Sequence, residues 1–152
     1  MDYNDIGWGI FDGNLCRFID QIDAEATSDG WWHIGPNESI YGRFARSIKL
    51  KDGKGGIYFD VNDVFAKECK EVEIRIVWLD KGLGEWTVFY NTEKKADKSL
   101  FTVKNGNTGK WMEKTVLVKD ACFANKGERS SDIYITSKSN ELCIFHLIEV
   151  TK

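Results

Sequence analysis

Hydrophobic and polar positions alternate along most of the chain, which predicts β-strands. Between Val72 and Trp78 the residues at even positions are hydrophobic, and Glu73 and Arg75 lie between them. This is the pattern of a strand with one buried face. The same pattern predicts further strands at Ile40–Leu50, Gly56–Val61, Trp86–Tyr90, Ser99–Val103, Lys114–Val118, Asp132–Thr136 and Leu142–Val150.

Turn-forming segments separate these strands. Three of them, Lys51–Gly55, Lys81–Gly84 and Lys104–Gly109, are rich in Gly, Asn, Asp and Lys, and Gly and Asn supply the positive φ angles that tight turns need. Only Asn62–Lys67 could form a helical turn. Short strands with no long helix predict an all-β fold, an antiparallel β-sandwich or jelly roll. We expect one domain spanning residues 1–152, because no repeat or linker interrupts the sequence.

The charge balance excludes two classes of partner. The chain carries 21 Lys and Arg against 24 Asp and Glu, a net charge of −3, with both signs scattered. Nucleic acids and anionic membranes require a concentrated positive field, so we expect neither as a partner. No hydrophobic run reaches the roughly 18–20 residues of a membrane span, and residues 1–5 do not resemble a secretion signal. From these residues we expect either a cytosolic protein or a domain of a longer one.

Common catalytic and metal-binding motifs are absent from the sequence. The four cysteines (Cys16, Cys69, Cys122 and Cys143) form no C-x-x-C pair, and His33 and His146 are far apart. Four cysteines allow three disulfide pairings, and reduced thiols are the expectation we favour. The sequence also lacks the G-x-S-x-G, P-loop and G-x-G-x-x-G signatures, so the usual hydrolases, nucleotide hydrolases and dinucleotide binders are not indicated.

The order of several segments resembles a known group of β-sandwiches. These segments are Gly56–Asp63, Val72–Asp80 with Gly82 and Gly84, Thr108–Trp111, Asp120–Phe123, Asp132–Ile135 and Phe145–Val150. Together they are similar to galactose-binding-like jelly rolls, the carbohydrate-binding modules appended to bacterial polysaccharide-degrading enzymes. The resemblance spans roughly residues 40 to 150 and rests on the order of the segments, since no single motif is diagnostic.

The resemblance implies a non-catalytic module that binds a polysaccharide or oligosaccharide. It implies an extracellular monomer within a larger secreted protein, tethered to a glycan-degrading catalytic domain. No cofactor is required, but the resemblance allows a structural calcium. Its ligands are unknown, although calcium takes oxygen ligands and the acids near the two chain ends are candidates: Asp20, Asp23, Asp29 and Glu149.

Six tryptophans are many for 152 residues, and sugar recognition uses exposed aromatic rings on which a pyranose can stack. We expect Trp78 and Trp111 to belong to the fold. Trp31 and Trp32 are adjacent, and neighbouring side chains of a strand face opposite ways, so at most one of them can enter the core. One of this pair is therefore the leading candidate platform, with Trp8 and Trp86 as further carbohydrate-binding candidates.

Polar residues close to the Trp pair complete the predicted site. His33, Tyr41 and Arg43 could exchange hydrogen bonds with sugar hydroxyls, and Arg43 with Arg46 could bind the carboxylate of a uronic acid. A solvated loop followed by an ordinary strand is the alternative. We expect His146 to be a hydrogen-bonded histidine at the edge of the core.

Three functions therefore remain compatible with the sequence. The leading one is a carbohydrate-binding module without enzymatic activity, acting through exposed Trp platforms. The second is a structural or protein-binding β-sandwich of a larger secreted protein. The third, a small jelly-roll glycan lyase or hydrolase, needs only a few well-placed acids or His33 with a carboxylate.

Overall fold

The structure is a computed structural model that describes residues 8–11, 15–16, 18–34, 43–64, 66–67 and 70–152, with the backbone alone for 8–11, 15–16, 32–34 and 43.

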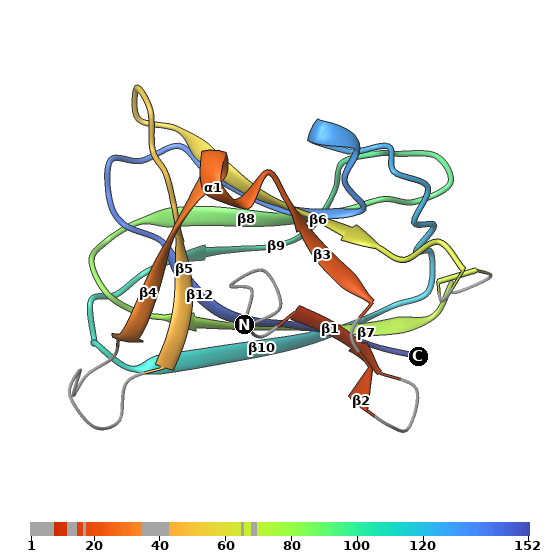
Figure 1. Cartoon of the computed structure of the whole chain (residues 1–152), viewed down its shortest axis with the longest axis horizontal. Coiled ribbons are helices and arrows are strands. Elements are labelled where there is room, and N and C mark those ends of the chain that lie inside the picture. The colour runs from red at the N-terminus through yellow and green to blue at the C-terminus, as the bar shows by residue number, and fades with distance from the viewer. Residues whose placement is uncertain (1–7, 12–14, 17, 35–42, 65, 68–69) are drawn as a thin grey trace.

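Two β-sheets form the two layers of the molecule (Figure 1). Sheet A has seven strands, which are β1 (Trp8–Phe11), β2 (Leu15–Cys16), β4 (Ser28–Ile34), β5 (Arg43–Ile48), β7 (Val72–Leu79), β10 (Trp111–Val118) and β12 (Ile144–Thr151). Five of them follow the order β10-β7-β12-β1-β2, and β5 pairs with β12 and with β4. Sheet B has five strands, which are β3 (Ile19–Ile22), β6 (Gly55–Val61), β8 (Glu85–Tyr90), β9 (Lys98–Lys104) and β11 (Ile133–Ser137). Their order is β3-β6-β11-β8-β9.

The predicted all-β sandwich is confirmed, with one departure from antiparallel pairing. Strand β1 runs parallel to β12, with Trp8 opposite Ile148. Every other pair of strands in the described residues is antiparallel. The parallel pair places an early strand of the chain beside the last strand in sheet A.

The eight predicted strands correspond to β5–β12, with ends that differ by a few residues. Strand β10 starts at Trp111, before the predicted Lys114. Strands β1–β4 and the short helix α1 (Ala24–Thr27) were not assigned from the sequence. The segment Asn62–Lys67, which could form a helical turn, contains two backbone hydrogen bonds of a turn, from the Ala66 N–H to the Asn62 carbonyl at 2.9 Å and from the Lys67 N–H to the Val64 carbonyl at 3.4 Å.

The core between the sheets contains a cluster of aromatic rings. The Trp86 ring meets Trp78 edge to face at 5.0 Å between centroids and Phe145 at 4.8 Å, and Phe101 lies 5.9 Å from it. Edge-to-face pairs of this kind stabilise a core beyond their area alone. Trp78 is buried, as predicted, and Trp111 is half-buried at the outer side of sheet A.

Two further sequence expectations can be compared with the described residues. Cys122 and Cys143 carry free thiols, and Cys143 is buried; the thiols of Cys16 and Cys69 lie outside the described residues. Neither α1 nor the 3-10 turn η2 (Glu128–Ser130), the two described helices, is long and apolar enough to cross a membrane.

Candidate functional site

The outer face of sheet B, which points away from the core, carries related side chains side by side on some neighbouring strands. Strand register places these rows one after another along the strands, and two of their members lie just beyond β11, with Asp132 directly before it and Lys138 directly after it. We name them the acidic row (Asp20, Asp60, Asp132), the aromatic row (Tyr58, Tyr134, Phe89), the hydroxyl row (Thr136, Thr87, Thr102) and the charged row (Lys138, Glu85, Lys104).

The aromatic row is a stack of three rings that is partly covered. Tyr134 stacks between Tyr58, at 6.0 Å, and Phe89, at 5.1 Å, with interplanar angles of 20°. The η2 turn covers the Tyr58 end, because the Tyr58 hydroxyl donates to Glu128 Oε2 at 3.1 Å and the Arg129 guanidinium lies 5.4 Å from the ring centre. Tyr58 and Tyr134 are buried, whereas Phe89 is half-buried. Phe89 is therefore the ring of this row that remains accessible.

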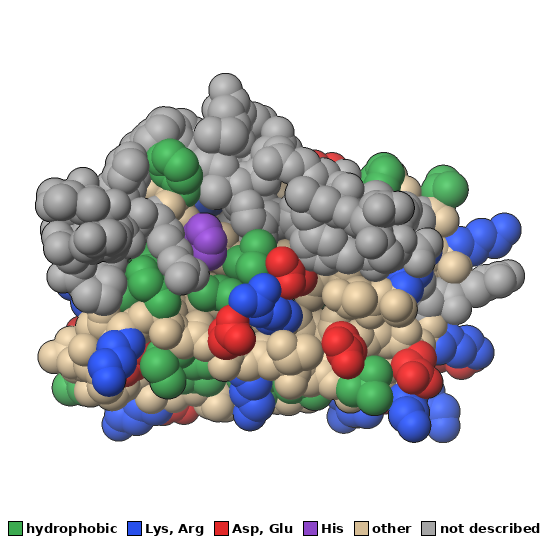
Figure 2. Space-filling view, turned by 90° about the horizontal axis from the view of Figure 1, so that it is seen from below, with side chains coloured by type: hydrophobic (Ala, Val, Ile, Leu, Met, Phe, Trp, Pro, Cys, Tyr) green, Lys and Arg blue, Asp and Glu red, His purple; other side chains and the backbone are tan. Residues whose placement is uncertain are grey.

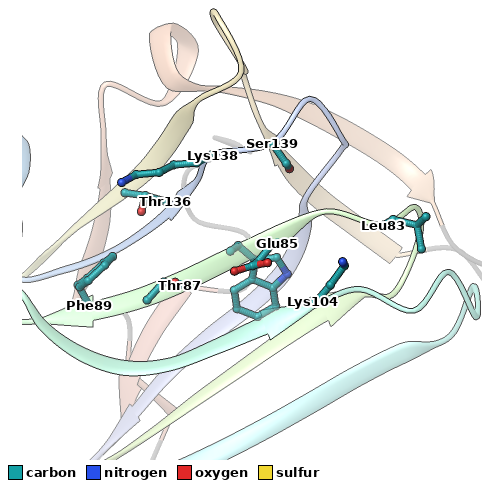
Figure 3. A pocket seen from close by; sticks show the side chains of 9 residues that line it. Leu83, Glu85, Thr87, Phe89, Lys104, Thr136, Lys138 and Ser139 are labelled. Carbon is teal, nitrogen blue, oxygen red and sulfur yellow. The ribbon is translucent and has the colours of Figure 1, made fainter.

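A groove begins at Phe89 and extends over the hydroxyl and charged rows (Figure 3). Its volume is about 410 Å³, within the range of small-ligand sites. Figure 3 shows Phe89 and Thr87 on one side, Leu83 at the other, and Lys138 and Lys104 on opposite sides of Glu85. The groove is lined by Leu83, Glu85, Trp86, Thr87, Phe89, Lys104, Thr136, Lys138 and Ser139.

The end of the groove near Lys104 is held by buried hydrogen bonds. Asn105 accepts a bond from the Trp86 indole at 3.2 Å, and Asp80 accepts bonds from the Gly106 N–H at 2.6 Å and the Thr108 hydroxyl at 2.6 Å. Burial would raise the pKa of Asp80, but the bonds from Thr108 and Gly106 outweigh it and lower the pKa. The ionised carboxylate thus fixes the loop that follows β9.

The acidic end of the same face is a compact cluster. Carboxyl oxygens of Asp60, Asp63 and Asp132 lie within 4.8 Å of one another. Asp132 is fully buried, and its two oxygens accept bonds from the Val61 and Asn125 N–H groups, each at 2.8 Å. Burial, with the nearby Asp60, raises the pKa of Asp132 to about 7 against the opposing backbone bonds. Burial and the charges of Asp63 and Asp20 likewise raise the pKa of Asp60, against the hydrogen bond with Asp132. Two close carboxyls that share a proton account for this arrangement.

The acids predicted near the chain ends do not assemble into one site. Asp23 pairs with Arg129 at 2.8 Å, Asp29 with Lys49 at 3.7 Å, and Glu149 with Arg75 at 2.9 Å. Asp20 lies opposite Asp60, at the edge of the acidic cluster. Oxygen ligands of this type suit calcium, which takes six to eight of them, and structural calcium stays a prediction.

Trp31 is the predicted platform that the structure places at the surface. It is 36% exposed on the outer face of sheet A, opposite Ala45 of β5. Its indole N–H donates to the Ser47 hydroxyl at 2.7 Å, which fixes one edge of the ring. The ring is available to a partner, and its role as a sugar platform stays a prediction.

Trp86 does not fit the platform role predicted for it. It is 1% exposed, inside the aromatic core cluster. Trp86, Val88 and Tyr90 face inward, whereas Thr87 and Phe89 face the groove. The accessible ring of β8 is therefore Phe89, on the opposite parity from the predicted tryptophan.

Arg46 cannot select a uronic acid as suggested. It is 3% exposed, and its Nε donates to the Ser28 hydroxyl at 2.8 Å, which also accepts a bond from the Gln21 amide at 2.7 Å. This buried polar network joins β3, β4 and β5 and holds the guanidinium away from the surface.

The remaining predicted site residues lie outside the side chains that the structure describes. Tyr41 lies outside the described residues, and the side chains of Trp8, Trp32, His33 and Arg43 are likewise not described. His146, in contrast, forms a hydrogen bond as expected, since its Nδ1 lies 2.6 Å from the Phe44 carbonyl oxygen.

A second cavity, of about 650 Å³, lies at the other end of β8. None of the eight residues that line it is aromatic, so it offers no ring on which a sugar could stack. Its lining consists of Lys70, Thr92, Glu93, Lys94, Lys119, Asp120, Ala121 and Cys122.

The described surface seen in Figure 2 carries Lys and Arg side chains interspersed with Asp and Glu. No broad area of a single sign is visible among the described residues on that face. This distribution agrees with the net charge of −3.

Comparison with known proteins gives distant structural matches. No protein-family model and no curated protein matches the sequence. The enzymatically active domain of tailspike protein 4 from bacteriophage CBA120 matches with a TM-score of 0.46 and 6% identity, over 88% of this chain and 19% of the tailspike chain. The K1 cleaved adhesin domain of Lys-gingipain from Porphyromonas gingivalis W83 matches with a TM-score of 0.45 and 10% identity, over 87% of this chain and 89% of that domain. The function of this chain must therefore be inferred from its own side chains.

Proposed function

We propose that the chain is a non-catalytic glycan-binding β-sandwich and that the groove on sheet B holds the sugar. The observation that carries this proposal is the lining of the groove, in which one accessible aromatic ring stands beside a row of hydroxyls and a few charged groups. A pyranose presents an apolar face and a rim of hydroxyls, so it needs both kinds of contact at once. Phe89 supplies the ring, and Thr87, Thr136 and Ser139 supply hydroxyls.

The same lining favours binding over cleavage. Glycosidases of the usual kind use two carboxyl groups that flank the scissile bond. Glu85 is the single carboxylate among the nine residues of the groove, and no histidine is among them. In this proposal the domain holds a polysaccharide for an attached glycan-degrading enzyme outside the cell, and the tether adds to the affinity.

Binding can be tested by affinity electrophoresis and calorimetry against a panel of soluble polysaccharides. Phe89→Ala should weaken binding of the retained glycan about tenfold, because the stacking surface is lost. Trp31→Ala, which removes an exposed ring from the other sheet, is the matched control. Absence of binding to every glycan, or equal binding by wild type and Phe89→Ala, would contradict the proposal. Reducing ends or unsaturated products after incubation would instead show an enzyme.

The exposure of Trp31 favours a second candidate function, attachment to a protein partner. Trp is enriched at the centres of protein interfaces, and the Trp31 ring lies on the sheet opposite the groove. In this case Trp31→Ala would abolish retention of a neighbouring domain while Phe89→Ala would not. A glycan bound through Trp31, with Phe89 dispensable, would instead support the platform predicted from the sequence.

A further inference from the structure

The charged row of the groove contains two lysines that have no acidic partner among the described residues. Lys104 and Lys138 are exposed, and neither forms an ion pair with any described residue. Glu85 lies directly opposite Lys104 in the register of β8 and β9, yet no ion pair joins them among the described contacts. Two ammonium groups and one carboxylate give this end of the groove a net positive charge inside a protein whose net charge is −3.

The lysines lie at the ends of the two strands that flank β8. Lys104 ends β9, and Lys138 directly follows β11, so they lie on either side of Glu85 (Figure 3). Neighbouring strands are about 4.8 Å apart, and the two lysines therefore begin about 10 Å apart across the groove. A ligand running across the strands would meet one ammonium group near each end.

The hydroxyl row follows the same direction. Thr136, Thr87 and Thr102 are in register across β11, β8 and β9, and the Thr87 and Thr102 hydroxyls lie 2.9 Å apart. The strands that carry this row are about 4.8 Å apart, which is close to the length of one sugar residue in an extended chain. A polysaccharide lying over this row would have the aromatic row along one edge and the charged row along the other.

We propose that the groove selects an acidic polysaccharide, one with carboxylates on its sugar rings, and that Lys104 and Lys138 bind those carboxylates while the chain runs across β11, β8 and β9. This inference rests on the proposed function and names its ligand class. Charge-assisted bonds to a carboxylate are stronger than bonds between neutral groups. Nucleic acid is disfavoured, because sites for single strands combine a positively charged groove with several aromatic rings for successive bases, and this groove offers one accessible ring, Phe89.

Polygalacturonate and its methyl ester form a matched pair of probes, because esterification removes the charge and keeps the sugar backbone. Polygalacturonate and alginate are the acidic probes, and calorimetry at low and high salt is the measurement. We expect the acid form to bind roughly tenfold more tightly than the ester at low salt, with the difference shrinking as salt screens the charges.

Lys104→Met with Lys138→Met should remove that difference. The control is Lys70→Met with Lys94→Met, which makes the same change of charge in the second cavity. Glu85→Gln should strengthen binding of the acid form a few-fold, because it removes the one negative charge of the groove. Thermal unfolding of every variant verifies that it is folded.

The outcomes distinguish failure of the acidic ligand from failure of the glycan-binding function. Equal binding of acid and ester, with both dependent on Phe89, overturns the acidic ligand and leaves the glycan-binding function standing. Loss of acid binding in the Lys70/Lys94 control places the anion in the second cavity and also overturns the inference. A preference for single-stranded nucleic acid over all glycans, or no binding to any polymer, overturns both proposals.

Discussion

The acidic row and the charged row lie at opposite ends of one sheet face, and they use their charges differently. Asp132 is fully buried, and both of its oxygens accept backbone N–H groups. Lys104, Lys138 and Glu85 are exposed and form no ion pair with the described residues. Enclosed ionisable groups whose oxygens have hydrogen-bond partners maintain a fold, whereas exposed charged groups without such partners can contribute to binding. The same face thus has a structural end and an open end.

The largest expected effect is a loss of stability when the structural end is mutated, with little change when the open end is mutated. Asp132→Ala should lower the free energy of unfolding by about 2–4 kcal/mol, because the buried Val61 N–H is left without an acceptor and the partly buried Asn125 N–H also loses its bond. Urea denaturation measures the change. Glu85→Ala is the control at the open end and should leave the unfolding midpoint almost unchanged. A similar loss in both variants would contradict the distinction.

A pH dependence should sharpen the same contrast. Unfolded Asp ionises near pH 4, whereas folded Asp132 holds its proton up to a pKa of about 7. The free energy of unfolding should therefore fall as pH rises between these values, by on the order of 3 kcal/mol. Asp132 and its neighbour Asp60 face two further acids, Asp63 and Asp20. No Lys or Arg among the described residues forms an ion pair with any of these four aspartates.

Denaturant unfolding near pH 5 and pH 8 tests this dependence. Asp132→Asn should flatten the difference between the two pH values, because the amide does not titrate. Asp80 and Asp120, whose pKa values are lowered, lose their charge below pH 4 and fall outside this window. Stability that rises with pH in the wild type, or an unchanged slope in Asp132→Asn, would show that the acidic pair does not share a proton in the folded state.

The smallest expected effect lies at the boundary between the two ends, where η2 covers the aromatic row. Tyr58→Phe removes the bond to Glu128 Oε2 and should cost about 1 kcal/mol. Glu128→Ala should cost a similar amount. Because both changes break one contact, the double variant should lose less than the sum, and a double-mutant cycle measures the coupling. Strict additivity would mean that the bond contributes nothing to holding the turn.

Most of the fold could be predicted from the sequence, since alternation depends on local residues alone. Strand β7, with its clear pattern between Val72 and Trp78, is the simplest case. Strand β8 shows the limit, because Trp86, Val88 and Tyr90 alternate with Thr87 and Phe89 and both sets contain an aromatic residue. Which set faces inward depends on the opposing sheet, where Phe145 and Trp78 receive the Trp86 ring.

The groove and the acidic cluster could not be predicted for a related reason. Asp60 and Asp132 are 72 positions apart and meet only because β6 pairs with β11. Lys104 and Lys138 flank Glu85 only because β9 and β11 are the two neighbours of β8. Strand order is set by packing over the whole chain, so spacing in the sequence carries no signal for either group.

The stack of Tyr58, Tyr134 and Phe89 has a consequence for the entropy of binding. A free phenylalanine at a surface samples several rotamers and loses that freedom when a ligand docks on it. Phe89 is held against Tyr134, and Tyr134 is held in turn by Tyr58, whose hydroxyl bonds to the η2 turn. Much of the rotational freedom of this ring is therefore lost during folding, and a sugar that arrives in the groove meets a surface already in its bound form.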